Sequence, residues 1–150
     1  MANFKNNAVK SMVVMRKAFR TIDARVSESF KVDHLTPTQF GVLDVLYAKG
    51  PIKIAELLDS MLATSGNMTV VIRNMEKKGW VTRTTCPHDK RAYLVGLTEQ
   101  GCQVIEHALP LHIAKIEETF SVLTEDEQAE LIRLLKKFKP CEQNNLQNQK

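Results

Sequence analysis

The sequence predicts one mainly α-helical domain that contains a single small β-hairpin. Three observations lead to this fold class. Apolar residues recur every three or four positions over most of the chain, which is the periodicity of amphipathic helices. Residues 81–98, VTRTTCPHDKRAYLVGLT, contain two runs rich in β-branched and aromatic residues on either side of a polar tip. The chain of 150 residues has no repeats and no linker-like stretch, so we expect residues 1–150 to form one domain.

The first two helices are predicted by periodicity and by end signals. Residues 8–30 carry a stripe of apolar side chains at steps of three and four, with charged residues between them. A second helix begins in LTPTQF, where Thr36 is the expected N-cap, Pro37 takes the first helical position and Gln39 completes a capping box. Gly50 is the expected end of this helix.

The middle of the chain predicts two short helices followed by the hairpin. IAELL turns its apolar residues to one side, NMTVVIRNMEKKG does the same, and Gly79 ends the second helix. The expected strands are residues 80–86 and 91–97. Two short helices with a tight connection, followed by a hairpin, are typical of a winged helix-turn-helix. We place the winged helix at about residues 36–98 and the helix-turn-helix motif at about residues 54–78.

The C-terminal region, residues 99–138, is expected to be helical. It begins after the cap residue Thr98, and Pro110 is expected to kink or interrupt the helix near residues 106–110. A last helix follows a capping box of Thr124 with Glu127. The polar tail, residues 139–150, is expected to fray.

The helices at 8–30 and 99–138 carry more apolar surface than one small winged-helix domain can cover. They either form a bundle within the chain or make the interface of a homodimer. We favour the homodimer, because helix-turn-helix proteins that bind DNA usually pair to match a palindromic site.

The charge distribution indicates where a polyanion would bind. The net charge is +4. From residue 73 to residue 91 there are six basic residues and two acidic ones, whereas residues 98–130 contain eight acidic residues and one basic residue. The basic stretch includes the hairpin tip and is the part of the chain suited to a nucleic acid.

Several other classes of function lack support in the sequence. There is no Gly-rich phosphate loop, no nucleophile elbow and no evident pair of catalytic carboxylates, so we expect no enzymatic activity and no cofactor. The three cysteines and four histidines lack the close spacing of metal ligands, so we expect no metal site. The N-terminus has no apolar signal-peptide core, and no segment approaches the ~20 apolar residues of a membrane span. We therefore expect a cytoplasmic protein with reduced thiols.

The run from Leu35 to Gly101 resembles the MarR family of bacterial transcriptional regulators, and the resemblance extends over nearly the entire chain. The most specific parts are LTPTQF, IAELL, NMEKKGWVTR, the DKR of the hairpin tip and LTEQG. The resemblance implies a triangular homodimer that represses transcription from a palindromic operator in its own promoter region. It also implies loss of DNA affinity when a small ligand or an oxidant acts, but no residue identifies that effector.

The resemblance places one helix in the major groove and the hairpin, the wing, at the flanking minor groove. The N-terminal end of a recognition helix usually meets base edges, and the residues there are Ser65, Asn67, Met68 and Thr69, with Arg73 one turn further on. Asn67 suits a base edge, and Thr69 suits a base or a phosphate. Ser65 can also serve as a helix cap.

The expected wing residues are His88, Asp89, Lys90 and Arg91. An arginine that enters a narrow minor groove is a recurring device in DNA recognition. In the family, an aspartate two residues before this arginine steadies the turn, and Asp89 and Arg91 match that pattern.

One position departs from the family. Many members have an Asp-Arg pair where this chain has Arg73 and Asn74, so the usual ion pair from the recognition helix to the wing is not expected here. Arg73 either contacts a phosphate or pairs with Asp89, and the sequence does not choose between them.

Cys86 is the one candidate for redox sensing, because it lies beside basic residues at the wing. A buried structural cysteine is the favoured interpretation. Two alternatives to a ligand-controlled repressor therefore stay open: a redox-sensing regulator that acts through Cys86, and a winged-helix module that binds proteins without binding DNA.

Overall fold

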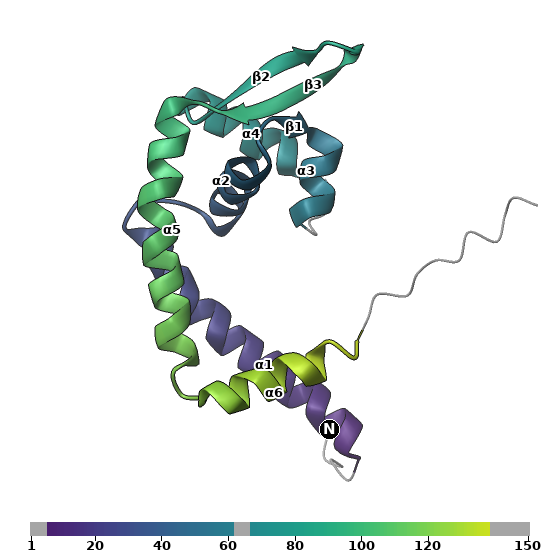
Figure 1. Cartoon of the computed structure of the whole chain (residues 1–150), viewed down its shortest axis with the longest axis vertical. Helices are drawn as coiled ribbons and strands as arrows, with labels where there is room; N and C mark the ends of the chain where they lie inside the picture. The colour runs from purple at the N-terminus through teal and green to yellow at the C-terminus, as the bar shows by residue number, and fades with distance from the viewer. Residues whose placement is uncertain (1–5, 62–66, 139–150) are drawn as a thin grey trace, which may run out of the picture.

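The computed structural model describes residues 6–61 and 67–138. Within these ranges the elements follow in the order α1 (Asn7–Val26), the 3-10 helix η1 (Ser27–Lys31), α2 (Pro37–Lys49), β1 (Ile52–Lys53), α3 (Ile54–Met61), α4 (Met68–Lys77), β2 (Val81–Cys86), β3 (Asp89–Leu97), α5 (Glu99–Phe120) and α6 (Glu125–Leu135). The chain has the outline of a letter C (Figure 1). A lobe of α2, α3, α4 and the hairpin lies at one end, α5 runs along the back, and α1 and α6 lie at the other end.

The predicted fold class is confirmed, with one strand more than expected. The sheet is antiparallel and has three strands in the order β1-β3-β2, because the two residues of β1 pair with β3 through Ile52 opposite Val95. So short a strand gives no alternation that could be recognised in the sequence. β3 also begins two residues earlier than predicted, at Asp89, which leaves Pro87 and His88 as the turn.

The core of the lobe lies between the three short helices, the sheet and the start of α5. Its fully buried side chains come from each of these elements: Val42, Leu43 and Leu46 on α2, Leu57 on α3, Ile72 and Met75 on α4, Val95 on β3 and Ile105 on α5. Burial of a side chain of this size stabilises the fold by roughly 1.5–3 kcal/mol. This core fixes α4 and the hairpin relative to each other, and those two elements carry most of the predicted site.

The end signals read from the sequence act as predicted. Thr36 and Gln39 form a capping box with Pro37 in the first turn of α2, and Thr124 and Glu127 form another at α6. Gly79 adopts a left-handed φ of 76° after α4. The backbone N–H groups of Gly79 and of the next residue donate to the carbonyls of Glu76 and Met75, which is the Schellman arrangement.

Two helix predictions need correction. The first helix does not continue to residue 30, because α1 ends at Val26 and the tighter 3-10 turn η1 follows. Pro110 does not interrupt α5, which is helical from Glu99 to Phe120. The proline removes one backbone donor, but the residues around it are held by packing, with Ala108 and Leu109 against the lobe core.

The beginning of α5 is fastened to the turn that follows α4. The Thr98 side chain caps α5 by accepting from the Gly101 backbone N–H, and the Thr98 hydroxyl donates to the Gly79 carbonyl. A Cβ atom on Gly101 would lie 2.0 Å from the carbonyl oxygen of Trp80, so no larger residue fits there. These contacts at the α5 joint fix the angle between α5 and α4, the helix that is expected to bind DNA.

The terminal helices carry apolar side chains that the chain leaves uncovered. Neither α1 nor α6 contains a buried residue. The exposed apolar residues of α1 and α6 include Val9, Met12, Met15, Phe19, Ile132, Leu134 and Leu135. A closed bundle within one chain would bury such stripes, and the described residues do not form one around α1 and α6. No helix within the described ranges has the length and apolar character of a membrane span.

Candidate nucleic-acid interface

The solvent-facing side of α4 carries three of the predicted recognition residues. Asn67 occupies the N-cap position without making a side-chain cap bond, so its amide is not engaged by the helix end. Asn67, Thr69 and Arg73 are exposed. Met68 must be removed from the predicted set, because it is only 4% exposed and belongs to the lobe core. Helical periodicity turns it to the same side as Ile72. Ser65 lies outside the described residues.

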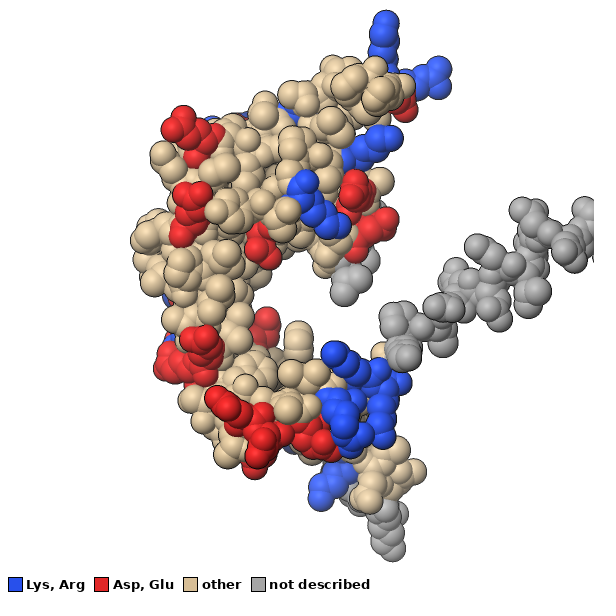
Figure 2. Space-filling view, in the orientation of Figure 1, with Lys and Arg blue, Asp and Glu red and all other residues tan. Residues whose placement is uncertain are grey.

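The wing tip presents the predicted basic residues to solvent. His88, Asp89, Lys90 and Arg91 are all exposed. Asp89 Oδ1 accepts a hydrogen bond of 2.9 Å from the Arg91 backbone N–H, which is the contact expected of an aspartate that steadies this turn. Lys and Arg side chains stand at the tip of the hairpin in Figure 2, and Asp and Glu side chains gather along the bend from α5 to α6. The two charge blocks of the sequence are therefore separated in space.

The structure excludes one of the two alternatives for Arg73, the ion pair with Asp89. Asp89 is engaged by the Arg91 backbone, and no ion pair joins Arg73 to Asp89. The link between α4 and the wing is made instead by Glu76 and Arg83. The Arg83 Nε donates to Glu76 Oε1 at 2.7 Å, and this bond, followed by the negative charge of Glu76, raises the pKa of the Arg83 guanidinium. Sequence reasoning missed this pair, although both residues lie in the NMEKKGWVTR stretch.

The chain is similar to known bacterial transcriptional regulators. The MarR family model matches residues 35–93. An uncharacterised HTH-type transcriptional regulator of Bacillus subtilis (strain 168), YkoM, is 37% identical over 83% of this chain and 80% of its own. The chain belongs to the MarR family. Another Bacillus subtilis (strain 168) regulator, MhqR, is 32% identical over 87% of this chain and 90% of its own.

Solved structures of MarR proteins share the fold. A cysteine mutant of E. coli MarR in complex with operator DNA has a TM-score of 0.82 and 29% identity, over 93% of this chain and 100% of that one. The MarR fold therefore extends beyond the matched residues 35–93 to the outer helices of this chain.

The structure describes two of the three cysteines, Cys86 and Cys102. Cys86 is 7% exposed and lies where the register between β2 and β3 becomes irregular. Cys102 is half-buried on α5, and both thiols are free. The third cysteine, Cys141, lies outside the described residues. Burial limits the access of an oxidant to Cys86, which favours a packing role for its side chain.

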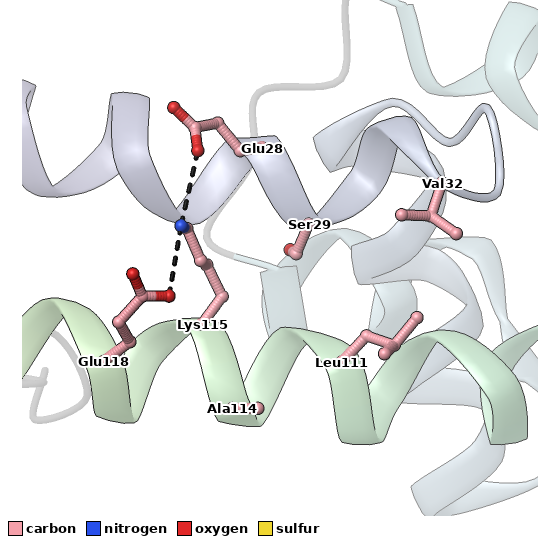
Figure 3. Close-up of a pocket in the computed structure, with 7 residues that line it drawn as sticks. All are labelled: Glu28, Ser29, Val32, Leu111, Ala114, Lys115 and Glu118. Atoms are coloured by element: carbon pink, nitrogen blue, oxygen red, sulfur yellow. Dashed lines mark hydrogen bonds and ion pairs between the residues drawn. The ribbon is translucent and has the colours of Figure 1, made fainter.

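An open groove lies between η1 and α5 (Figure 3). Its volume is about 340 Å³, within the range of small-molecule sites. The lining residues are Glu28, Ser29, Val32, Leu111, Ala114, Lys115 and Glu118. The Lys115 ammonium bridges Glu28 at 3.3 Å and Glu118 at 3.2 Å, and hydrogen bonds to these carboxylates raise its pKa. The groove therefore offers an apolar floor and one charge-paired cation.

His112 lies at the junction of α5, η1 and α2. Its ring stands 4.8 Å from the centroid of Phe30 and 4.4 Å from that of Phe40. Burial lowers the pKa of His112, and the nearby Asp44 opposes this shift. Ser29 Oγ donates to the Val26 carbonyl and lies 3.0 Å from His112 Nδ1. Since a hydroxyl has one hydrogen, the histidine is the donor in the second contact.

The other histidine of α5, His107, pairs with a residue that follows η1. His107 Nδ1 lies 2.9 Å from Asp33 Oδ1, and this is an exposed pair. No group of three or more His, Cys, Asp or Glu side chains gathers in the part of the chain that the structure describes.

Proposed function

We propose that this chain is a transcriptional regulator that binds a specific, palindromic double-stranded DNA site as a homodimer, most simply as a repressor of its own promoter. The observation that carries the proposal is that two exposed elements, α4 and the wing tip, are held in a fixed position relative to each other. One core and the Glu76–Arg83 pair connect them. In winged helix-turn-helix proteins, such elements contact a major groove and the adjacent minor groove.

The proposed DNA contacts come from both elements. Asn67 and Thr69 would meet base edges, and Arg73 would meet a phosphate of the same groove. Lys90 and Arg91 would enter the minor groove, with Asp89 holding the turn and His88 at its edge. These residues are exposed and, apart from the Asp89 bond to the Arg91 backbone, have no side-chain bonds among the described residues that binding would have to break.

The homodimer is supported by the uncovered apolar stripes of α1 and α6. Apolar side chains at Val9, Met12, Met15 and Phe19 follow helical spacing on a helix without a buried residue. A second copy of the chain would bury them and place two α4 helices on one face of the DNA. The half-sites would then lie about one helical turn, ~34–36 Å, apart.

Control by a small ligand is the finer part of the proposal. The groove between η1 and α5 lies at the joint between the lobe and the outer helices, so a bound molecule there would change the angle between them (Figure 3). The effector would combine an apolar body with a charged or polar group that competes for Lys115. The proposal places the protein in the cytoplasm, where the DNA lies, and assigns it no catalytic step.

The test is a footprint on the DNA upstream of the gene that encodes the chain. The proposal predicts two protected half-sites related by a dyad, with centres one helical turn apart, and enhanced minor-groove protection at the outer edges. The protein bound to this DNA should have twice the molecular mass of one chain. Protection that is absent at every protein concentration, or a single undivided site bound by one chain, would contradict the proposal.

A further inference from the structure

The underside of the wing carries an arginine whose role is not explained by the recognition helix or by the wing tip. Residues 81, 83 and 85 of β2 point to one face of the hairpin, because side chains alternate along a strand. Arg83 is opposite Val95, which is fully buried, and Thr85 is opposite Tyr93, which is 51% exposed. This face therefore begins in the lobe core and continues outward to solvent below the tip. Arg83 stands at the boundary between the two.

Two contacts fix the guanidinium of Arg83. Its Nε donates to Glu76 Oε1 at 2.7 Å, and the guanidinium carbon lies 5.9 Å from the centre of the Tyr93 ring. Within the described residues, the terminal nitrogens of Arg83 donate to no protein group, and the side chain is 40% exposed. An arginine held in this way at Nε presents its remaining N–H groups in a fixed direction.

The position of this arginine matches a particular part of a bound duplex. The sugar–phosphate backbone is the ridge that separates a major groove from the next minor groove. If α4 lies in one groove and the wing tip in the other, the surface between them faces the ridge. That surface is made by Glu76 on α4, Arg83 on β2 and Tyr93 on β3.

We propose that Arg83 binds a phosphate of the backbone strand that passes between α4 and the wing, and that Glu76 is a positioning residue that aims the guanidinium at it. The inference rests on the proposed function and adds a contact that the recognition-helix and wing residues do not supply. Glu76 carries a negative charge and would repel DNA if it were free. Paired with Nε, it leaves the outer nitrogens of Arg83 to meet the phosphate.

The competing explanation is an ion pair that only stabilises the fold. Exposed ion pairs contribute little to stability, and the chain contains a matched case for comparison. Arg133 and Glu130 on α6 form an ion pair of the same length, 2.7 Å, with side chains 57% and 54% exposed. Arg133 is away from the hairpin, so Arg133→Ala is the control for Arg83→Ala once its dimer mass is found equal to that of the wild type, because α6 also carries part of the proposed dimer interface.

The experiment measures binding of the full chain to two duplexes over a range of salt concentrations. One duplex is the DNA upstream of the gene, and the other has the same length and an unrelated sequence. Dimer mass and melting temperature are measured for each variant. Arg83→Ala should weaken binding to both duplexes by a similar factor, roughly tenfold, because a phosphate contact carries no sequence information. The slope of log K against log salt should become shallower by about 0.9 for each chain bound.

Two milder variants separate charge from orientation. Arg83→Lys and Glu76→Ala both keep the positive charge at residue 83, so the salt slope should remain near that of the wild type, and Glu76→Ala removes the acceptor that holds Nε. Each should nevertheless lose affinity, because the guanidinium is replaced or no longer held at Nε.

The inference is overturned if Arg83→Ala binds both duplexes with wild-type affinity and slope, or if it matches Arg133→Ala. A lower melting temperature with unchanged DNA binding would assign the pair to folding alone and would overturn it as well. Failure of the wild-type chain to bind either duplex is a different result, because it would remove the proposed function together with this contact.

Discussion

Phe19 offers a sharp test of the dimer interface. It lies on α1 and is 68% exposed, more than the other apolar residues of the α1 stripe. If a second chain covers this stripe, Phe19→Ser removes an aromatic anchor from both halves of the interface at once. The lobe core contains no residue of α1, so the change should leave the DNA-binding lobe folded.

The expected magnitude follows from the exposed area. A Phe side chain buries at least ~150 Å² when fully covered, so about 100 Å² of Phe19 remains to be buried. At ~25 cal/mol per Å², complete burial would contribute about 2.5 kcal/mol for each chain and about 5 kcal/mol for the dimer. Interfaces seldom reach complete burial. Half of this value, about 2.5 kcal/mol, corresponds to a dimer that dissociates at roughly 50–100-fold higher concentration.

The assay is a dilution series followed by sedimentation or light scattering. Val70→Ser is the matched control, because Val70 is 51% exposed and lies on α4. The account predicts a large increase in the dimer Kd for Phe19→Ser and none for Val70→Ser. A change of less than about threefold for Phe19→Ser, or an equal change for both variants, would refute the assignment of α1 to the interface.

Three further predictions concern the wing, the α5 joint and the half-buried histidine His112. Arg91→Ala should weaken binding to upstream DNA substantially without changing dimer mass, whereas Lys31→Ala on η1 should leave binding unchanged in the same shift assay. Gly101→Ala should lower the free energy of unfolding by about 2 kcal/mol, because its Cβ would meet the Trp80 carbonyl, as denaturant titration would show. His112 has a pKa below its ordinary value of 6.5, so stability should fall as pH drops below about 6.5, and His112→Phe should flatten the melting temperature against pH.

Each of these expectations has a contradicting result. Wild-type affinity for Arg91→Ala would remove the wing tip from the mechanism. Gln103→Ala changes an exposed position on α5, so an equal loss for Gln103→Ala and Gly101→Ala would show that the Trp80 contact is not the cause. The pH prediction for His112 follows from the direction of its pKa shift. His112 takes up a proton at a higher pH in the unfolded chain than in the folded one, so acid favours unfolding. A melting curve for His112→Phe that keeps the wild-type pH dependence would refute it.

Local signals in the sequence predicted the element ends well, because they act within a few residues. The capping boxes at Thr36 and Thr124 and the left-handed Gly79 need only their own neighbours, and all three are present. The continuity of α5 through Pro110 was not predictable in this way. A proline removes one backbone bond, but the packing that offsets this loss comes from residues of the lobe, far away in the sequence.

The site was predictable in part for the same reason. The residue types at the wing tip and the start of α4 predicted exposed basic and polar side chains, and these are exposed, whereas the inward turn of Met68 depends on where α4 begins. The Glu76–Arg83 pair joins a helix to a strand across a turn. Its two residues are visible in the sequence, but their contact depends on the angle that the Gly79 turn sets between the two elements.

The most direct test of the account is the salt dependence of binding to the upstream DNA. If Arg73, Arg83, Lys90 and Arg91 of both chains each neutralise one phosphate, log K should fall against log salt with a slope of about −7. A steep negative slope with much tighter binding to the upstream duplex than to an unrelated one is the predicted result. Weak binding of equal strength to both duplexes, or a slope near zero, would contradict the claim that this surface recognises DNA.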